Sequence, residues 1–205
     1  RVVVDGAEGT TALVARHAVA VCTGTAALLP GTPGLADIAP WTSREATSVH
    51  DVPASLAIVG GGVVACEMAT AFASFGTHVT MLVRSGLLAG IEPFAQEAVA
   101  EGLRRAGVDV RMHTEPTAVE RGPDGVRVSF DAGEDLVADE ILIATGRVPR
   151  TEDLGLETVG LEPGAWLDVD DTLRVRGHDS LYAVGDVNHR ALLTHQGKYQ
   201  ARAAG

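Results

Sequence analysis

A glycine-rich segment with the spacing of a dinucleotide-binding loop occupies residues 60–65, which read Gly60, Gly61, Gly62, Val63, Val64 and Ala65. It fits G-x-G-x-x-A, follows an apolar run at 56–59 and opens a helical pattern at 63–75. In this spacing Gly60 permits a tight turn, Gly62 lets the backbone approach a pyrophosphate, and Ala65 allows close helix–strand packing. The helix N-terminus adds free N–H groups and positive potential. The context predicts dinucleotide binding, and a glycine turn that only packs is the alternative.

Glu67 is the only charged residue between Asp51 and Arg84, in a helical pattern that is apolar nearly all round. Burying an unpaired carboxylate is costly, so we expect Glu67 to be paired or to face a site. Stabilisation of the first helical turn by an acidic residue is the alternative interpretation.

Arg84 ends the next predicted strand, 78–83, where an acid would bind the ribose 2′-hydroxyl of NAD or an arginine the 2′-phosphate of NADP. No Asp or Glu occurs between Glu67 and Glu92. The sequence therefore favours NADPH, by about tenfold to a hundredfold for one arginine without a basic neighbour. A solvated surface arginine is the alternative.

The segment 55–112 reads strand-helix-strand-helix-strand at short spacing, which right-handed crossovers wind into a parallel sheet. Short strands with hairpin turns follow over 117–144. The Thr-Gly-Arg at 145–147 echoes the Thr-Gly-Thr at 23–25. These patterns predict an α/β fold with a Rossmann-like nucleotide-binding domain.

Composition excludes several classes of protein. A net charge of −11 and an aromatic content of 4% argue against a nucleic-acid partner. The longest uncharged stretch, 17–36, contains Gly and Pro and cannot form an uninterrupted membrane-spanning helix. Two cysteines, Cys22 and Cys66, make no disulfide framework and favour a reducing, cytoplasmic compartment. His189 and His195 form no metal-binding motif, so no metal site is expected.

The segments V-C-T-G-T, I-V-G-G-G-V-V-A-C-E, I-A-T-G-R-V-P and L-Y-A-V-G-D-V occur in this order and are followed by L-L-T-H-Q-G-K-Y-Q-A-R-A-A-G. The ordered set resembles the flavin-dependent pyridine nucleotide–disulfide oxidoreductases, the group of dihydrolipoamide dehydrogenase, mercuric reductase and glutathione reductase. The resemblance implies a split FAD-binding domain at 1–35 and 151–205, with an NAD(P)-binding domain at 36–150 inserted between its parts.

The resemblance also implies roles for individual residues. Asp186 would accept a hydrogen bond from a ribityl hydroxyl of FAD, and Gly185 would allow the approach. Thr194 would place its backbone N–H near the flavin ring, and Glu67 would lie near the nicotinamide and pair with a lysine outside this chain. The remaining implied contacts are with FAD, for Thr23, Gly24 and Thr25, and with the nicotinamide nucleotide, for Val119 and Gly146.

By the same resemblance, the whole protein would be a homodimer that passes hydride from NAD(P)H to FAD. The reduced flavin would then reduce a small-molecule or thiol/disulfide acceptor. The family's first G-x-G-x-x-G, its redox C-x-x-x-x-C and its C-terminal domain with a catalytic histidine are missing from this sequence. We therefore expect the chain to be a central piece that is inactive alone, with Cys22 and Cys66 as small core residues.

Two other functions remain open at this point. One is a flavin reductase of the NADH-oxidase or ferredoxin-reductase kind, which has the same fold but does not reduce a disulfide. The other is a non-catalytic dinucleotide-binding module that acts as a redox sensor. A C-x-x-x-x-C upstream would favour the disulfide reductase over the first, and turnover of NADPH by an intact flavin half would exclude the second.

Overall fold

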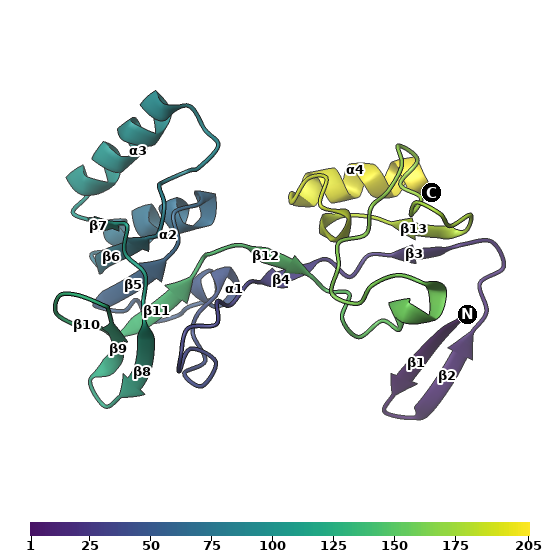
Figure 1. Cartoon of the computed structure of the whole chain (residues 1–205), viewed down its shortest axis with the longest axis horizontal. Helices are drawn as coiled ribbons and strands as arrows, with labels where there is room; N and C mark the ends of the chain where they lie inside the picture. The colour runs from purple at the N-terminus through teal and green to yellow at the C-terminus, as the bar shows by residue number, and fades with distance from the viewer. The chain divides into compact units, whose positions relative to one another are not determined.

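The computed structural model describes all residues from Arg1 to Gly205, and their contacts divide the chain into two units (Figure 1). The split unit comprises residues 1–26 and 148–205, and the central unit comprises 27–147. The first boundary lies earlier than the predicted one after residue 35. The reason is that Leu35 and Ile38 are buried in a core of the central unit. The second boundary lies close to the predicted position.

A four-stranded parallel sheet in the order β11-β5-β6-β7 forms the middle of the central unit. Its elements are β5 (Ser55–Val59), α2 (Val63–Ser74), β6 (His78–Val83), α3 (Pro93–Arg105), β7 (Asp109–Met112) and β11 (Glu140–Ile143). The predicted alternation of strands and helices, and with it the Rossmann-like α/β fold, is confirmed.

Both faces of this sheet are covered, because alternate residues of each strand point to opposite sides. On β5, Leu56 and Ile58 join the core beneath α2 and α3, whereas Ala57 and Val59 join the core on the other face. All four side chains are buried. Such burial on both sides explains why β5 is a continuous apolar run after its first residue.

The second covering layer is the antiparallel sheet β10-β9-β8, seen opposite α2 and α3 in Figure 1. Its strands are β8 (Ala118–Gly122), β9 (Gly125–Ser129) and β10 (Leu136–Ala138). Arg121 on β8 donates two hydrogen bonds of 2.8 Å to Glu140 on β11 and one of 3.1 Å to the Ile38 carbonyl oxygen. This bidentate pair connects the antiparallel layer to the first residue of β11, an edge strand of the parallel sheet.

The short helix α1 (Ser43–Ala46) begins with a capping box formed by Thr42 and Glu45. The Thr42 N–H donates to the Glu45 carboxylate at 2.9 Å, and Thr42 Oγ1 accepts from the Arg44 N–H. Just before it, Trp41 extends the sheet beside β11, since its N–H donates to Ile141 and its carbonyl accepts from Ile143.

The split unit is built around a parallel pair, β3 (Val19–Val21) and β13 (Leu181–Ala183). Its other elements are the hairpin β1 (Val2–Gly6) and β2 (Gly9–Leu13), the 3₁₀ helices η1 (Leu156–Val159) and η2 (Asp186–Asn188), and α4 (Thr194–Ala204). The strands β4 (Thr25–Ala27) and β12 (Arg147–Pro149) link the two units and are neighbours in a two-stranded sheet.

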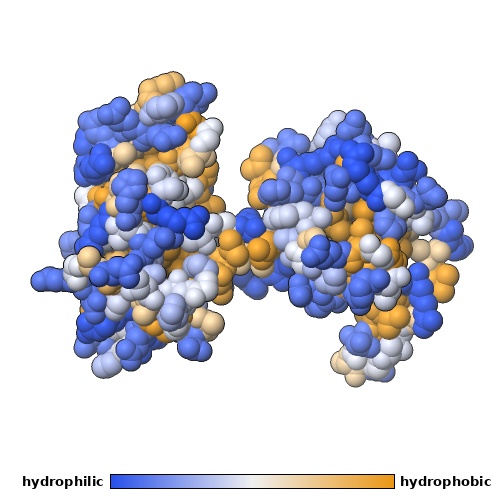
Figure 2. All heavy atoms as spheres, in the orientation of Figure 1, coloured by the Kyte–Doolittle hydropathy of each residue, from blue (hydrophilic) through white to orange (hydrophobic).

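Apolar side chains remain exposed on the β1–β2 hairpin, where every residue is accessible to solvent. Val2, Val3, Val4 and Leu13 are each more than a third exposed, and Figure 2 shows hydrophobic colour at the hairpin's position in Figure 1. None of the helices is both long and apolar enough to cross a membrane.

Candidate functional site

The glycine loop lies at the carboxyl end of β5, where α/β sheets bind their ligands. Gly60 has a φ of +134° and donates a 3.0 Å hydrogen bond to Leu82 on β6. A Cβ added to Gly60 would overlap the carbonyl oxygen of Ala144, just beyond β11. The tight turn predicted at Gly60 is therefore present, and the fold itself requires glycine there.

Packing also requires glycine at position 61, although the motif allows any residue type there. An added Cβ would lie 2.6 Å from the Gly86 carbonyl oxygen and 2.8 Å from Val83 Cγ1. The carbonyl of Gly61 also accepts a 2.6 Å hydrogen bond from the Leu88 N–H. The close approach holds the chain that leaves β6 beside the glycine loop.

Gly62 has no such structural requirement. Its φ of −81° suits any residue, and no atom lies within 4 Å of an added Cβ. It is the N-cap of α2, where no side chain caps the helix and the first backbone N–H groups have no partner within the helix. Open space in front of free donors and a helix dipole is the geometry of an anion-binding site.

The first turns of α2 divide into a buried and an exposed side. Ala65 is fully buried, as its predicted packing role requires, whereas Val63 and Val64 are exposed. Glu67 is exposed as well. The premise that Glu67 is buried is therefore wrong, because a helix resting on a sheet buries one side only, and Glu67 avoids the cost of desolvation. The expectation that Glu67 faces a site stays a prediction.

Arg84 follows β6 directly, and its guanidinium Nη1 lies 3.6 Å from Glu115 Oε1. Glu115 comes after β7, the neighbouring strand, so the two residues share the carboxyl edge of the sheet. The sequence contains no acid near Arg84, yet the fold brings one in from a segment 31 residues away. The sequence indicated that Arg84 has no carboxylate nearby, but in the structure Glu115 is its neighbour at this edge.

Gly146 lies at the same edge, just after β11, with a φ of +142°. Its carbonyl oxygen accepts a 2.9 Å hydrogen bond from the Leu28 N–H, and Thr145 Oγ1 donates to the Leu28 carbonyl at 2.8 Å. This segment adjoins the glycine loop through the contact between Ala144 and Gly60.

Val119 lies elsewhere, on β8 in the antiparallel layer. Its side chain is buried in the core shared with Ile141, and its N–H donates to the Pro33 carbonyl at 2.9 Å. The expected contact between Val119 and a nicotinamide nucleotide stays a prediction, and it cannot use the side chain or the N–H, because both are engaged within the fold. The turn that leads into β8 holds Glu115 and lies nearer the sheet edge.

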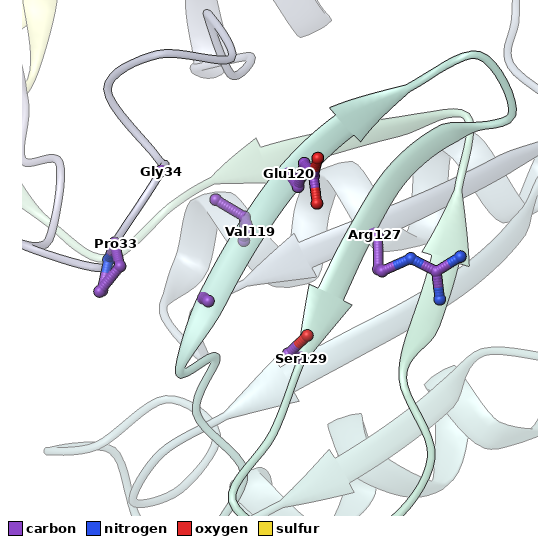
Figure 3. Close-up of a pocket in the computed structure, with 7 residues that line it drawn as sticks. Pro33, Gly34, Val119, Glu120, Arg127 and Ser129 are labelled. Atoms are coloured by element: carbon purple, nitrogen blue, oxygen red, sulfur yellow. The ribbon is translucent and has the colours of Figure 1, made fainter.

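A pocket of about 290 Å³ opens beside Val119. Figure 3 shows it between the loop at Pro33 and Gly34 and the strands that carry Glu120, Arg127 and Ser129. Its lining includes neither the glycine loop nor Arg84. Val119 is the one predicted nucleotide contact among the residues that line the pocket.

In the split unit, the predicted FAD residues follow two neighbouring parallel strands. Thr23, Gly24 and Thr25 come after β3, and Gly185 and Asp186 come after β13. Thr25 Oγ1 donates a 3.1 Å hydrogen bond to Asp186 Oδ2, which fixes the carboxylate at this edge.

Gln200 is a further residue at this edge that the sequence did not single out. Its buried Oε1 accepts hydrogen bonds of 2.8 Å from the Gly185 N–H and from Asn188 Nδ2. Asn188 Nδ2 also donates to the Ala183 carbonyl at 2.9 Å. The network holds the turn that carries Asp186. The sequence does not indicate it, because no local pattern shows that a glutamine on a helix will contact a distant glycine-aspartate turn.

The residues of this edge fit the ribityl side of FAD. The φ of +83° at Gly185 favours glycine, and Gly185 lies against Gly197 of α4, so the backbones approach closely. Thr194 is the first residue of α4, and no side chain caps that helix. A half-buried carboxylate can accept a hydrogen bond from a polyol, and a free helix N-terminus can donate one to the oxygen or nitrogen acceptors of a flavin ring.

The two cysteines differ in environment. Cys66 is buried on α2, and burial, followed by the nearby charge of Glu67, raises the pKa of its thiol. Cys22 is exposed just beyond β3, so its expected place in the core is wrong. A strand end is more open than a strand centre, and apolar neighbours in the sequence do not reveal this.

Comparisons with known proteins agree with this arrangement. A profile of the family described as "Pyridine nucleotide-disulphide oxidoreductase" matches residues 1–202. The chain is 37% identical to a mercuric reductase of Shigella flexneri over 203 residues, 97% of this chain and 35% of that protein. It is 35% identical to a glutathione reductase of Burkholderia cepacia, over 95% of this chain and 42% of that protein. The chain thus spans well under half the length of these curated relatives.

Two solved structures are similar over most of the chain. The HOCl-induced flavoprotein disulfide reductase RclA from Escherichia coli matches with a TM-score of 0.82 and 28% identity, over 90% of this chain and 43% of that one. LpdA from Mycobacterium tuberculosis matches with a TM-score of 0.85 and 28% identity, over 98% of this chain and 44% of that one.

Proposed function

Because the chain belongs to the pyridine nucleotide–disulphide oxidoreductase family, we propose that it carries the NAD(P)H site and part of the FAD site of a disulfide reductase. The family consists of flavin-dependent oxidoreductases that act on sulfur groups. In the proposed reaction NAD(P)H binds to the central unit and reduces FAD, which passes the electrons to a thiol/disulfide or related acceptor. We place this enzyme in the cytoplasm as a homodimer.

The observation that carries the proposal is the open space at Gly62. Gly60 and Gly61 are glycines because neighbouring backbone leaves no room for a side chain, but no neighbour accounts for Gly62. A pyrophosphate against the free N–H groups of α2 does account for it. The nearby Arg84 is the candidate contact for the adenosine ribose.

The split unit would hold FAD through Asp186, which accepts from a ribityl hydroxyl while Thr25 and Gln200 keep its turn in place. The Thr194 N–H, free at the start of α4, would donate to the flavin ring. Bound FAD supplies the hydride acceptor and the electron carrier, and the protein supplies position and electrostatics.

Glu67 is proposed as a residue near the nicotinamide. Glu67 lies in the second turn of α2, just beyond the free donors, and its exposure leaves the carboxylate available for a partner. In the whole protein, Glu67→Gln should slow flavin reduction and leave NADPH affinity nearly unchanged. Flavin reduction at the wild-type rate in stopped-flow measurements would mean that Glu67 is only an exposed charge on α2.

The function is tested by anaerobic reduction of the whole protein with NADPH, followed by addition of oxidised glutathione as the disulfide probe. We expect the flavin to be bleached by NADPH and reoxidised by the disulfide. Asp186→Ala should lower the flavin content, whereas Asp179→Ala removes an exposed charge from the same unit and should not. A protein with no flavin, or a flavin that NADPH leaves oxidised, would contradict the proposal.

A further inference from the structure

The ion pair between Arg84 and Glu115 lies where the adenosine ribose of the proposed cofactor would end. We propose that Glu115 is a specificity-determining residue, which competes with the cofactor's 2′-phosphate for Arg84 and so reduces the preference for NADPH over NADH. The inference rests on the proposed binding of NAD(P)H to the central unit. It corrects the preference that the sequence predicts from Arg84 alone.

The fold fixes the two residues at one edge through paired backbone. Val83 and Met112 are register partners at the ends of β6 and β7, and the Thr114 N–H donates to the Val83 carbonyl at 3.2 Å. Arg84 and Glu115 each follow this last contact by one residue. Their proximity therefore follows from strand pairing, and not only from the choice of two long side chains.

The nucleotide would reach this pair from the glycine loop. Gly61 contacts Gly86, so the chain just beyond Arg84 lies against the loop proposed to hold the pyrophosphate. The side chains of Arg84 and Glu115 are 77% and 60% exposed, which leaves both free to exchange partners when a ligand arrives.

The two cofactors make opposite demands on the pair. A 2′-phosphate needs the Arg84 guanidinium, so it must displace the Glu115 carboxylate and then sit near a like charge. A 2′-hydroxyl needs no cation, and NADH leaves the pair intact. Exposed ion pairs are weak, so we expect Glu115 to lower the affinity for a 2′-phosphate by about twofold to fivefold.

The test compares adenosine 2′,5′-bisphosphate with AMP, which differ only in the 2′-phosphate, by calorimetric titration of the 205-residue chain. Glu115→Gln should strengthen binding of the bisphosphate by about twofold to fivefold and change AMP binding little. Arg84→Gln should weaken binding of the bisphosphate. In the Arg84→Gln background, Glu115→Gln should have no further effect, because the competition acts through Arg84.

Glu101→Gln is the matched control. Glu101 forms an exposed ion pair with Arg105 that resembles the Arg84–Glu115 pair, with exposures of 64% and 72%. It lies in the last turns of α3, which lead back to the amino end of β7 and away from the glycine loop. Its replacement removes the same charge and should leave both affinities unchanged.

Several results would overturn the inference. An unchanged bisphosphate affinity in Glu115→Gln, an equal gain in Glu101→Gln, or a gain that persists without Arg84 would each show that Glu115 does not compete for Arg84. In these cases AMP still binds and the proposed function stands. If neither nucleotide binds the folded wild-type chain, the proposed nucleotide site fails and the inference fails with it.

Discussion

Replacing Gly60 and Gly62 separately with alanine should separate folding from nucleotide binding within a single loop. Both residues belong to the same motif, but they meet opposite surroundings. Gly60 is enclosed by Ala144 and has a left-handed backbone, whereas Gly62 faces open space with an ordinary backbone. Gly60→Ala should therefore lower the stability of the central unit, whereas Gly62→Ala should lower only the affinity for the nucleotide.

The magnitudes follow from these surroundings. At Gly60, backbone strain of about 1–3 kcal/mol and steric overlap of about 1–3 kcal/mol should lower the free energy of unfolding by about 2–6 kcal/mol. At Gly62, alanine adopts the observed φ of −81° without strain. Alanine is only a poorer N-cap than glycine, so the cost should stay below about 1 kcal/mol.

Urea denaturation followed by tryptophan fluorescence measures the first effect. Trp41 packs near Phe72 in the central unit, whereas Trp166 lies in the split unit. A Trp166→Phe background therefore confines the signal to the unit that carries the loop. Calorimetric titration with ADP measures the second effect, for which we expect Gly62→Ala to weaken binding at least about tenfold.

Two results would refute the reasoning. ADP binding by Gly62→Ala with the wild-type affinity would mean that no phosphate approaches this position. Equal destabilisation by the two substitutions would mean that the space at Gly62 is occupied by protein groups in solution. Either outcome would remove the observation on which the proposed nucleotide site depends.

Three other substitutions or reactions test the local structure. Gln200→Leu leaves the Gly185 N–H and Asn188 Nδ2 without their buried acceptor, so urea denaturation should show a loss of about 2–4 kcal/mol; a loss below about 0.5 kcal/mol, as at an ordinary surface position, would mean that water replaces the glutamine. Cys22 should react with a thiol reagent much faster than Cys66, as measured by peptide mapping. The reason is that Cys22 is exposed, whereas burial raises the pKa of Cys66. Equal rates would contradict the burial of Cys66. Hydrogen bonds from the Thr42 hydroxyl and N–H lower the pKa of Glu45 below its usual 4.5, so its stabilising contribution is present above that pH and is lost as the pH falls through the folded pKa. Glu45→Gln should cost about 0.5–1 kcal/mol near pH 7, because the carboxylate is exposed to solvent, and its cost should shrink in acid, whereas a cost that is constant with pH would show that the capping box does not depend on the charge.

Much of the central unit could be predicted from its sequence. The apolar runs, the glycines after them and the cap at Thr42 are local signals, because a strand or a helix end is decided within a few residues. The order of strands and helices predicted for 55–112 is confirmed. The family resemblance was also accessible, since it rests on short segments in a fixed order.

The division of the chain at residue 26, the exposure of Glu67 and the burial of Val119 required the tertiary structure. Each depends on which side of an element meets another layer. An apolar helix such as α2 does not reveal which of its sides rests on the sheet. A valine in a short strand does not reveal whether its N–H bonds to a loop 86 residues earlier.

The sequence by itself determined that a glycine loop follows a buried strand and that Arg84 ends the next one, because both are local consequences of chain order. Only the tertiary structure brought Glu115 to Arg84, closed Gly61 against Gly86 and left Gly62 open. Parallel strands run in the same direction, so their carboxyl ends meet at one edge whatever their separation along the chain. The charges that meet there are therefore set by the pairing of strands, which no local pattern specifies.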